Sequence, residues 1–213
     1  MKFDHFIKEV GALPLFDLTL AVQVSGESKG HLLVQLHRWV RAGKVIALRR
    51  GLYTLADVYR RAALSPLVVA NELYRPSYLS GLWALGYYGL IPEKVVRFTS
   101  VTPRVTRSFR NPFGAFSYSS LKQAFFWGFE SKAIQGSQVW MAEPEKALLD
   151  FWHLNAGEWT ADRLREMRFQ GFEAVDMDRL SAYAGRWGAP RLIRAVSRYR
   201  GLAEAHDNGV VAP

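Results

Sequence analysis

Apolar side chains recur with a helical period through the first part of the chain. Apolar residues at positions 3, 6, 7 and 10 predict a short helix that ends at Gly11, and the apolar segment from Leu15 to Val24 predicts a second helix. A tight turn follows at residues 25–28, with Ser25 or Ser28 as the N-cap of a third helix. That helix is predicted over residues 29–42, because apolar positions 32, 36, 39 and 40 share one face before Gly43.

The periodicity changes after Gly43. Residues 44–55 have the pattern of two short strands that turn around Arg49-Arg50-Gly51. Three short helices and a basic-tipped hairpin, within about sixty residues, follow the order of a winged helix-turn-helix, whose third helix enters the major groove. We therefore predict a winged helix-turn-helix DNA-binding domain over residues 1–62, with the hairpin on the adjacent backbone or minor groove.

The polar face of the third predicted helix carries basic and amide side chains and no acidic one. Arg and Gln can each bond two acceptors on a base edge, and Lys neutralises phosphate, so this face suits DNA. An ordinary solvated face is the alternative, although such a face would usually mix both signs. With the helix cap and the hairpin, the predicted DNA-contacting residues are Ser28, Lys29, His31, Gln35, Arg38, Arg41, Lys44, Arg49 and Arg50.

Residues 63–213 have a mixed pattern. We expect sheet and helices to about residue 155 and a helical end over residues 156–205, which makes the whole chain an α+β protein. The expected helices cover residues 66–73, 78–88 (capped by Ser77), 143–154, 160–167, 176–187 and 190–205. The expected strands cover residues 95–101, 113–118 and 132–141, and the tail from His206 is expected to be frayed.

The chain has 213 residues and a formal net charge of +9, from 28 basic and 19 acidic side chains, which favours a polyanionic partner. The charge is uneven: the segment from Lys94 to Arg110 holds five basic residues and no acidic one. A solvated face, added phosphate contact and a docking surface for an acidic partner all stay open for it. The possible additional basic surface is formed by Arg97, Arg104, Arg107 and Arg110, and a further arginine stripe lies at positions 191, 194, 198 and 200.

Several classes of protein are disfavoured. The chain has no cysteine, which fits a reducing compartment and removes disulfides and thiolate metal sites. No apolar region follows a basic start, so we expect no signal peptide. The longest uncharged stretch, from Pro76 to Pro92, is too short and too polar to span a bilayer. We expect a cytoplasmic, nucleoid-associated protein with no membrane partner.

The acidic helix start near residue 145 raises the possibility of an enzyme. A nuclease of the Asp…(Asp/Glu)-x-Lys kind needs a carboxylate two residues before its lysine, but Pro144 precedes Lys146 at that spacing. Lys146 can instead pair with Asp150 at i,i+4. The five histidines are scattered, and the sequence lacks a phosphate-binding glycine loop and a nucleophile elbow. We predict no enzymatic activity, no catalytic residues, no metal and no cofactor.

Several ordered segments resemble the AbiEi family, the antitoxins of type IV toxin–antitoxin systems. The resemblance covers roughly residues 1 to 155, and its more specific parts are the Pro-Ser-Tyr and Glu-Lys-Ala-Leu-Leu-Asp motifs. The segments that carry it are residues 43–46, 49–53, 69–71, 76–80, 84–85, 88–92, 99–102 and 142–150.

This resemblance implies a transcriptional repressor that binds inverted repeats at the promoter of its own operon. It also implies that the second domain, residues 63–213, counteracts a nucleotidyltransferase toxin, often without a stable complex. A winged-helix regulator of another operon, with a ligand-sensing or oligomerising second domain, is one alternative. An enzyme whose site is assembled from residues taken here as structural, such as Glu145 and Lys146, is the other.

Overall fold

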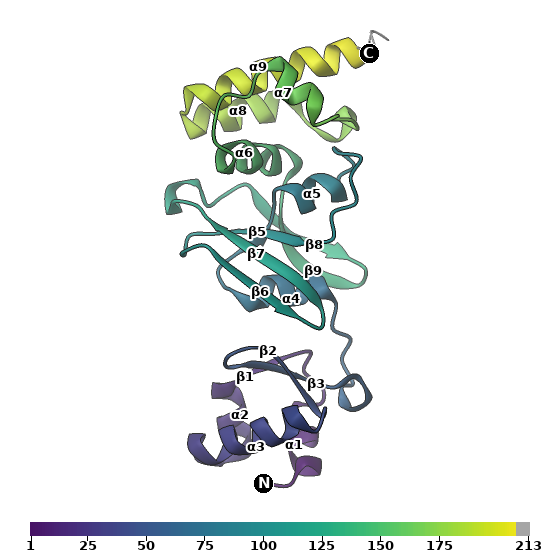
Figure 1. The fold of residues 1–213 in the computed structure, drawn as a ribbon, viewed down its shortest axis with the longest axis vertical. Helices are drawn as coiled ribbons and strands as arrows, with labels where there is room; N and C mark the ends of the chain where they lie inside the picture. The colour runs from purple at the N-terminus through teal and green to yellow at the C-terminus, as the bar shows by residue number, and fades with distance from the viewer. Residues whose placement is uncertain (208–213) are drawn as a thin grey trace. The chain divides into compact units, whose positions relative to one another are not determined.

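The computed structural model describes residues 1–207 and has an α+β fold, as the sequence predicted. The chain divides into two compact units. The first unit comprises Met1–Leu73 together with Phe109–Ala115, and the second comprises Tyr74–Ser108 together with the chain from Phe116 onward. Figure 1 shows the elements of both units, which are described separately below.

The first unit opens with three helices and a small antiparallel sheet. Strand β3 lies between β1 and β2, so that Phe16 pairs with Tyr53, and Ala47 pairs with Tyr53 from the other side. A short 3-10 turn, η1, and helix α4 follow the hairpin. The elements are α1 (Phe3–Val10), β1 (Phe16–Asp17), α2 (Leu18–Ser25), α3 (Lys29–Arg41), β2 (Val45–Arg49), β3 (Leu52–Leu55), η1 (Asp57–Tyr59) and α4 (Pro66–Leu73).

Aromatic and aliphatic side chains from all three helices form the core of this unit. The Phe6 ring lies 5.3 Å from Phe16 and 4.9 Å from Trp39, measured between ring centroids. Leu32 and Leu36 of α3 are buried in the same cluster. The apolar stripe that predicted α3 is therefore the stripe that packs on the core.

The expected helix over Leu15–Val24 is wrong in its first residues. Phe16 and Asp17 are extended and form β1, and α2 begins only at Leu18. The Asp17 side chain accepts a hydrogen bond of 2.7 Å from the Leu20 backbone N–H, which caps the helix. Pairing with β3 and this cap together set the start of α2.

A six-stranded sheet in the order β6-β7-β5-β4-β9-β8 is the centre of the second unit, although the end of β6 and the start of β7 fall within residues 109–115 of the first unit. Strand β4 has two residues, yet it bridges the two halves: Tyr78 pairs antiparallel with Val101, and Leu79 pairs parallel with Met141. The elements are β4 (Tyr78–Leu79), α5 (Leu82–Tyr87), β5 (Phe98–Thr102), β6 (Arg107–Asn111), β7 (Gly114–Ser120), η2 (Gln123–Phe125), β8 (Phe129–Ile134) and β9 (Ser137–Ala142).

One helix prediction and one strand prediction in this unit need correction, and one strand was missed. The expected helix over residues 78–88 starts at Leu82, because residues 78 and 79 form β4 and Gly81, with φ 60°, precedes the helix. The expected strand over residues 132–141 is a hairpin, because Gln135 and Gly136 both have positive φ, as a tight turn of this kind requires. Strand β6 was not predicted.

The C-terminal helices form a layer beyond α6 in Figure 1. Helix α6 lies between the sheet and this layer, packing against β9, α8 and α9, and nearly all of its side chains are buried for that reason. The elements are α6 (Pro144–Leu154), α7 (Ala161–Glu166), η3 (Phe172–Ala174), α8 (Met177–Trp187) and α9 (Pro190–Asp207). The tail that was expected to fray is helical to Asp207, and its remainder lies outside the described residues.

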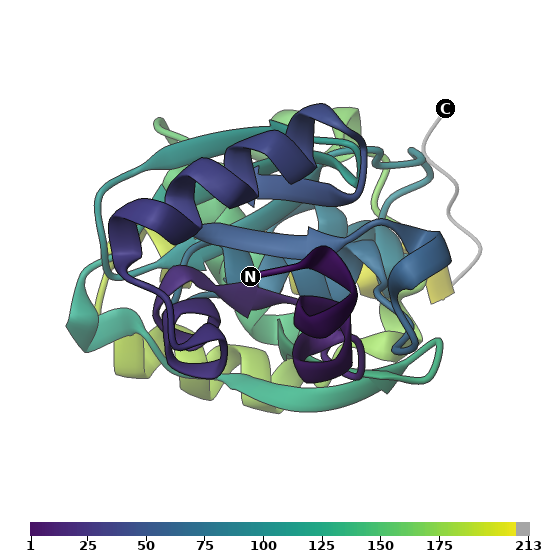
Figure 2. The same cartoon turned by 90° about the horizontal axis from the view of Figure 1, so that it is seen from below.

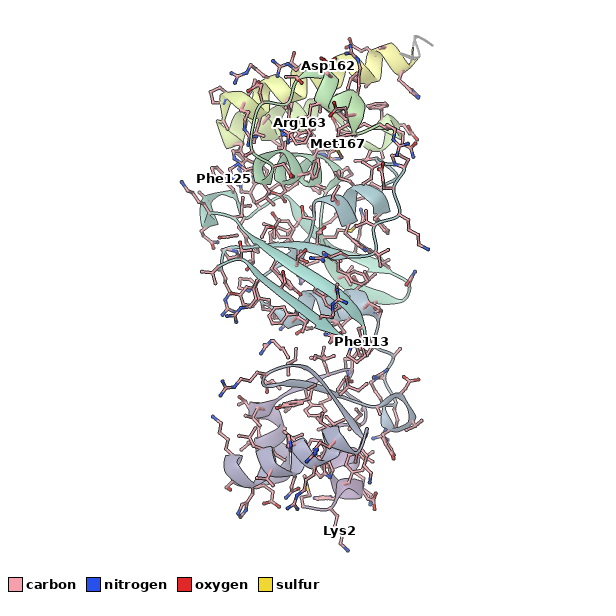
Figure 3. All side chains as sticks on the ribbon, in the orientation of Figure 1. Lys2, Phe113, Phe125, Asp162, Arg163 and Met167 are labelled. Carbon is pink, nitrogen blue, oxygen red and sulfur yellow. The ribbon has the colours of Figure 1, made fainter. Side chains whose placement is uncertain are left out.

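The arginine stripe of α9 is used inside the second unit. Arg194 and Arg198 both bond the Glu158 carboxylate at 2.8 Å, and Arg191 donates to the main-chain oxygens of residues 153, 155 and 157. Nearby, the Arg163 guanidinium (labelled in Figure 3) lies 3.8 Å above the Trp159 ring. These contacts join the segment after α6 to α9 and leave this stripe little free charge. None of the helices within residues 1–207 is both long and apolar enough to cross a membrane.

The ion pairs of Glu158 with Arg194 and Arg198 predict that the stability of the second unit falls at acid pH. Hydrogen bonds from Arg194 and Arg198 lower the pKa of Glu158 from 4.5 to about 2. A carboxylate whose pKa is lower in the folded state stabilises the fold fully above pH 4.5, and this contribution is lost as the pH falls from 4.5 towards 2. We expect Glu158→Gln to lower the urea midpoint at pH 7 and to flatten its decline between pH 4.5 and 2.5. Glu166→Gln, at an exposed carboxylate on α7, is the control. An unchanged pH profile in Glu158→Gln would contradict the prediction.

Candidate nucleic-acid interface

A tight, capped turn joins α2 to α3. Gly26 adopts φ 64°, which ends α2, and the Ser28 side chain accepts from the His31 backbone N–H at 3.3 Å. Of the two serines expected as caps, Ser28 is the N-cap of α3. After this turn, α3 lies along the surface of the first unit. Figure 2 shows the helix on the side of the unit that faces the viewer.

Four of the predicted cationic or histidine side chains on α3 are exposed. They are Lys29 and His31 in the first turn, and Arg38 and Arg41 in the last two turns. Within the described residues, neither Arg38 nor Arg41 forms an ion pair, so both charges are available to an anion. His31 lies 3.8 Å from Glu27, whose carboxylate also bonds the N-terminal ammonium.

Two other predicted contacts are partly buried. Gln35 faces Met1: with its amide oriented to satisfy both groups, it donates to the Met1 carbonyl oxygen and accepts from its ammonium, each at 2.9 Å. The Lys44 ammonium lies 4.8 Å above the Phe3 ring. A role at DNA stays a prediction for both, but each side chain has a partner within the protein. Fewer of the predicted DNA-contacting side chains are therefore fully exposed than expected.

The two arginines at the hairpin tip differ in their contacts and exposure. The Arg49 guanidinium donates through Nε to the Leu73 carbonyl at 2.6 Å and through a terminal nitrogen to the Arg50 carbonyl at 2.9 Å. Asn111 also bonds the Leu48 carbonyl at 3.2 Å, so this end of β2 is tied to other parts of the first unit. Arg50 is exposed. Phosphate contact by Arg49 would compete with these bonds, whereas Arg50 is available for it.

The possible additional basic surface does not form one cluster. All four of its arginines are exposed, but Arg104 and Arg107 gather around the Tyr74 ring, at 4.3 and 5.7 Å from its centroid. Arg104 also donates to the Arg75 carbonyl at 2.9 Å. Arg97 precedes β5, and Arg110 belongs to the edge strand β6. A purely solvated or packing role explains this segment as well as an anion site does.

The structure adds residues to the α3 face that the sequence analysis passed over. Gly30, Val34 and His37 are exposed on the side opposite the buried Leu32 and Leu36. The exposed fraction is 53% for Val34 and 40% for Leu33, which lies at the edge of this face. At about 100° per residue, the helical spacing places positions 30, 34, 37, 38 and 41 together, so this signal was available in the sequence.

The second unit contains a different polar cluster, which is fully buried. Lys146 and Asp150 of α6 are both 0% exposed and form the ion pair that their i,i+4 spacing indicated. Asp150 also accepts from the Tyr78 hydroxyl at 3.0 Å and the Ser80 hydroxyl at 2.7 Å, and Lys146 donates to the Tyr78 oxygen at 2.8 Å. The cluster joins α6 to β4.

Burial sets the ionisation of this cluster. Desolvation lowers the pKa of Lys146, an effect that the Asp150 carboxylate opposes, and it raises the pKa of the Tyr78 phenol. The Lys146 ammonium also lies 4.7 Å above the Trp187 ring. Because the charged atoms are enclosed, no substrate can reach them, and we assign the cluster a structural role.

The neighbouring carboxylates of α6 also have partners. Glu145, 0% exposed, accepts from the Asp176 backbone N–H at 2.7 Å and pairs with Arg179 at 3.1 Å. Glu143 accepts a hydrogen bond from the Tyr183 hydroxyl. These contacts join the start of α6 to α8. Within residues 1–207, no group of three or more His, Asp or Glu side chains has the arrangement to hold a metal ion.

Comparison with known proteins adds no identification. A scan against protein-family models gives no match, and a search of curated proteins by sequence gives none either.

The buried pair predicts a large loss of stability when one charge is removed. Asp150→Ala leaves the Lys146 ammonium buried without its counter-charge, and we expect a cost of about 3–5 kcal/mol in the free energy of unfolding. Lys146→Met also destabilises, and the double variant should lose less than the sum of the two single losses. Urea unfolding followed by circular dichroism measures all three. Additive losses would show that the two charges are not coupled.

Proposed function

We propose that the first unit is a winged helix-turn-helix that binds double-stranded DNA, with α3 in the major groove. The observation that carries the proposal is that α3 exposes Arg38 and Arg41 on one face and Lys29 at its start, and contains no carboxylate of its own. Such a face is attracted to phosphate and can bond base edges. The order of helices, tight turn and hairpin is that of this class of domain.

The hairpin contributes less than a freely projecting wing would. Arg50 is its exposed cation, whereas Arg49 is bonded to main-chain oxygens of the first unit. We assign backbone attraction to Arg50 and base recognition to α3. The free energy of binding then comes largely from phosphate neutralisation, which makes affinity fall steeply with salt.

The motif resemblance supports a more specific role for the whole chain. We propose that it represses its own operon by binding inverted repeats at the promoter, and that it is an antitoxin that counteracts a nucleotidyltransferase toxin. The Pro-Ser-Tyr and Glu-Lys-Ala-Leu-Leu-Asp segments that resemble the AbiEi family include Tyr78, Lys146 and Asp150 of the buried cluster. In this fold the contacts of these three residues join α6 to β4.

DNA binding is tested by gel-shift titration on the upstream region of the gene, against scrambled DNA of equal length. We expect at least tenfold tighter binding to the upstream DNA. Arg38→Ala should weaken specific binding more than general binding, and Arg50→Ala should weaken both equally. Each lost phosphate contact makes the negative slope of log K against log salt shallower by about 0.9. Arg165→Ala, an exposed arginine of α7, is the control. Equal, weak binding to both DNAs would contradict the proposal.

The antitoxin role is tested by co-expression with a nucleotidyltransferase encoded next to the gene. We expect the intact chain to restore growth of a bacterial host that produces this toxin. An Arg38→Ala, Arg41→Ala double variant should still restore growth, because the resemblance assigns neutralisation to the second domain. Failure of the intact chain to protect, with DNA binding retained, would favour the regulator of another operon, with a ligand-sensing or oligomerising second unit.

A further inference from the structure

A large apolar side chain is exposed on the outer face of α3. Val34 lies opposite Leu32 and Leu36, and 53% of its surface is accessible. Cations and a histidine surround it along the helix, at positions 37, 38 and 41. An exposed valine needs no explanation by itself, but here it occupies the centre of the face that the proposed function places in the major groove.

Gly30 lies one turn before Val34 on the same face. Glycine is less favourable than alanine in a helix, by up to about 1 kcal/mol in the helix interior. A Cβ at Gly30 would meet nothing within 4 Å, and its backbone does not have positive φ. Neither packing nor backbone conformation within the protein therefore requires glycine there. Close approach of another molecule to the start of α3 would require it.

In the major groove, the apolar group that a base presents is the 5-methyl of thymine. We infer that Val34 contacts a thymine methyl, that Gly30 lets α3 approach the base pairs closely enough for that contact, and that His37 and Arg38 bond the flanking base edges or phosphates. The inference rests on the proposed DNA-binding function and adds the chemical feature that this helix reads.

A protein partner fits the same face less well. Val34 and the partly exposed Leu33 are the large apolar side chains that α3 exposes, and both lie among cations. The buried centre of a protein–protein interface is largely apolar, and two aliphatic side chains provide little of such a centre. Two apolar side chains among basic groups match the mixed edge of a base pair beside its phosphates.

The test begins with selection of bound duplexes from a randomised DNA library by the full chain. Each thymine of the selected site is then replaced by deoxyuridine, which removes only the 5-methyl group. We expect one or two positions at which this replacement weakens binding about three- to tenfold. With Val34→Ala, the loss at those positions should disappear. Val58→Ala, which alters a valine of η1 that is 84% exposed, should retain it.

A second variant separates the inference from a folding defect. Gly30→Ala should keep or raise the thermal midpoint and weaken binding to the selected site at least tenfold. Gly201→Ala, in α9 with equally open surroundings, should leave binding unchanged. Enrichment of a site whose affinity does not respond to deoxyuridine, or an equal response in Val34→Ala, would overturn the inference and leave the proposed function standing. No enriched sequence would overturn the proposed function itself.

Discussion

The second unit depends on an ion pair that water does not reach. Enclosing Lys146 and Asp150 costs several kcal/mol per charge, which only well-formed contacts offset. Here Asp150 accepts from Tyr78 and Ser80 as well as from Lys146. Tyr78 lies in β4 and Ser80 directly after it, and β4 has two residues and few ladder bonds of its own. The side chains of α6 therefore hold the middle of the sheet together. Close packing around Lys146 also favours glycine at position 128, because a Cβ there would lie 3.0–3.1 Å from the Lys146 side-chain carbons.

The first unit has the opposite arrangement, with apolar side chains at the surface and no buried charge in its core cluster. Phe6, Phe16 and Trp39 form a compact aromatic core that fixes α3 against α1 and β1. Because Leu32 and Leu36 anchor the inner side of α3, packing fixes the position of its outer side, as the proposed reading of base pairs would need. The buried ion pair of the second unit and the exposed Val34 of the first are both exceptions to the usual rule of apolar inside and charged outside.

The sequence predicted long periodic elements well and tertiary exceptions poorly. Helices α1, α3 and α6 follow directly from their apolar spacing, and Gly43 and Pro144 fall near the helix ends where they were expected. Strand β4 was read as helix, since local pattern carries no record of the sheet that buries it. The Lys146–Asp150 pair was predicted from its i,i+4 spacing, but its burial depends on the surrounding layers, which the spacing does not reveal. Gln35 of α3 and Arg49 of β2 were assigned by residue type, but their partners, Met1 and Leu73, are brought to them by the fold.

The net charge of +9 counts charged residues by type, but whether each charge can contact a partner depends on the position of its side chain. Many arginines of the second unit are bonded within that unit. Arg194 and Arg198 both pair with the Glu158 carboxylate, and Arg179 pairs with Glu145. Arg191 donates to three main-chain oxygens. Charges held in this way add to the overall field but present few donors to an incoming polyanion. On α3, by contrast, Arg38 and Arg41 are exposed without an ion pair in the described residues. Long-range attraction to an anion would therefore be a property of the whole chain, whereas contact would be concentrated on the helix with exposed, unpaired cations. For this reason, the basic composition suggested only the class of partner, and the proposal that it binds at α3 rests on the position of these cations.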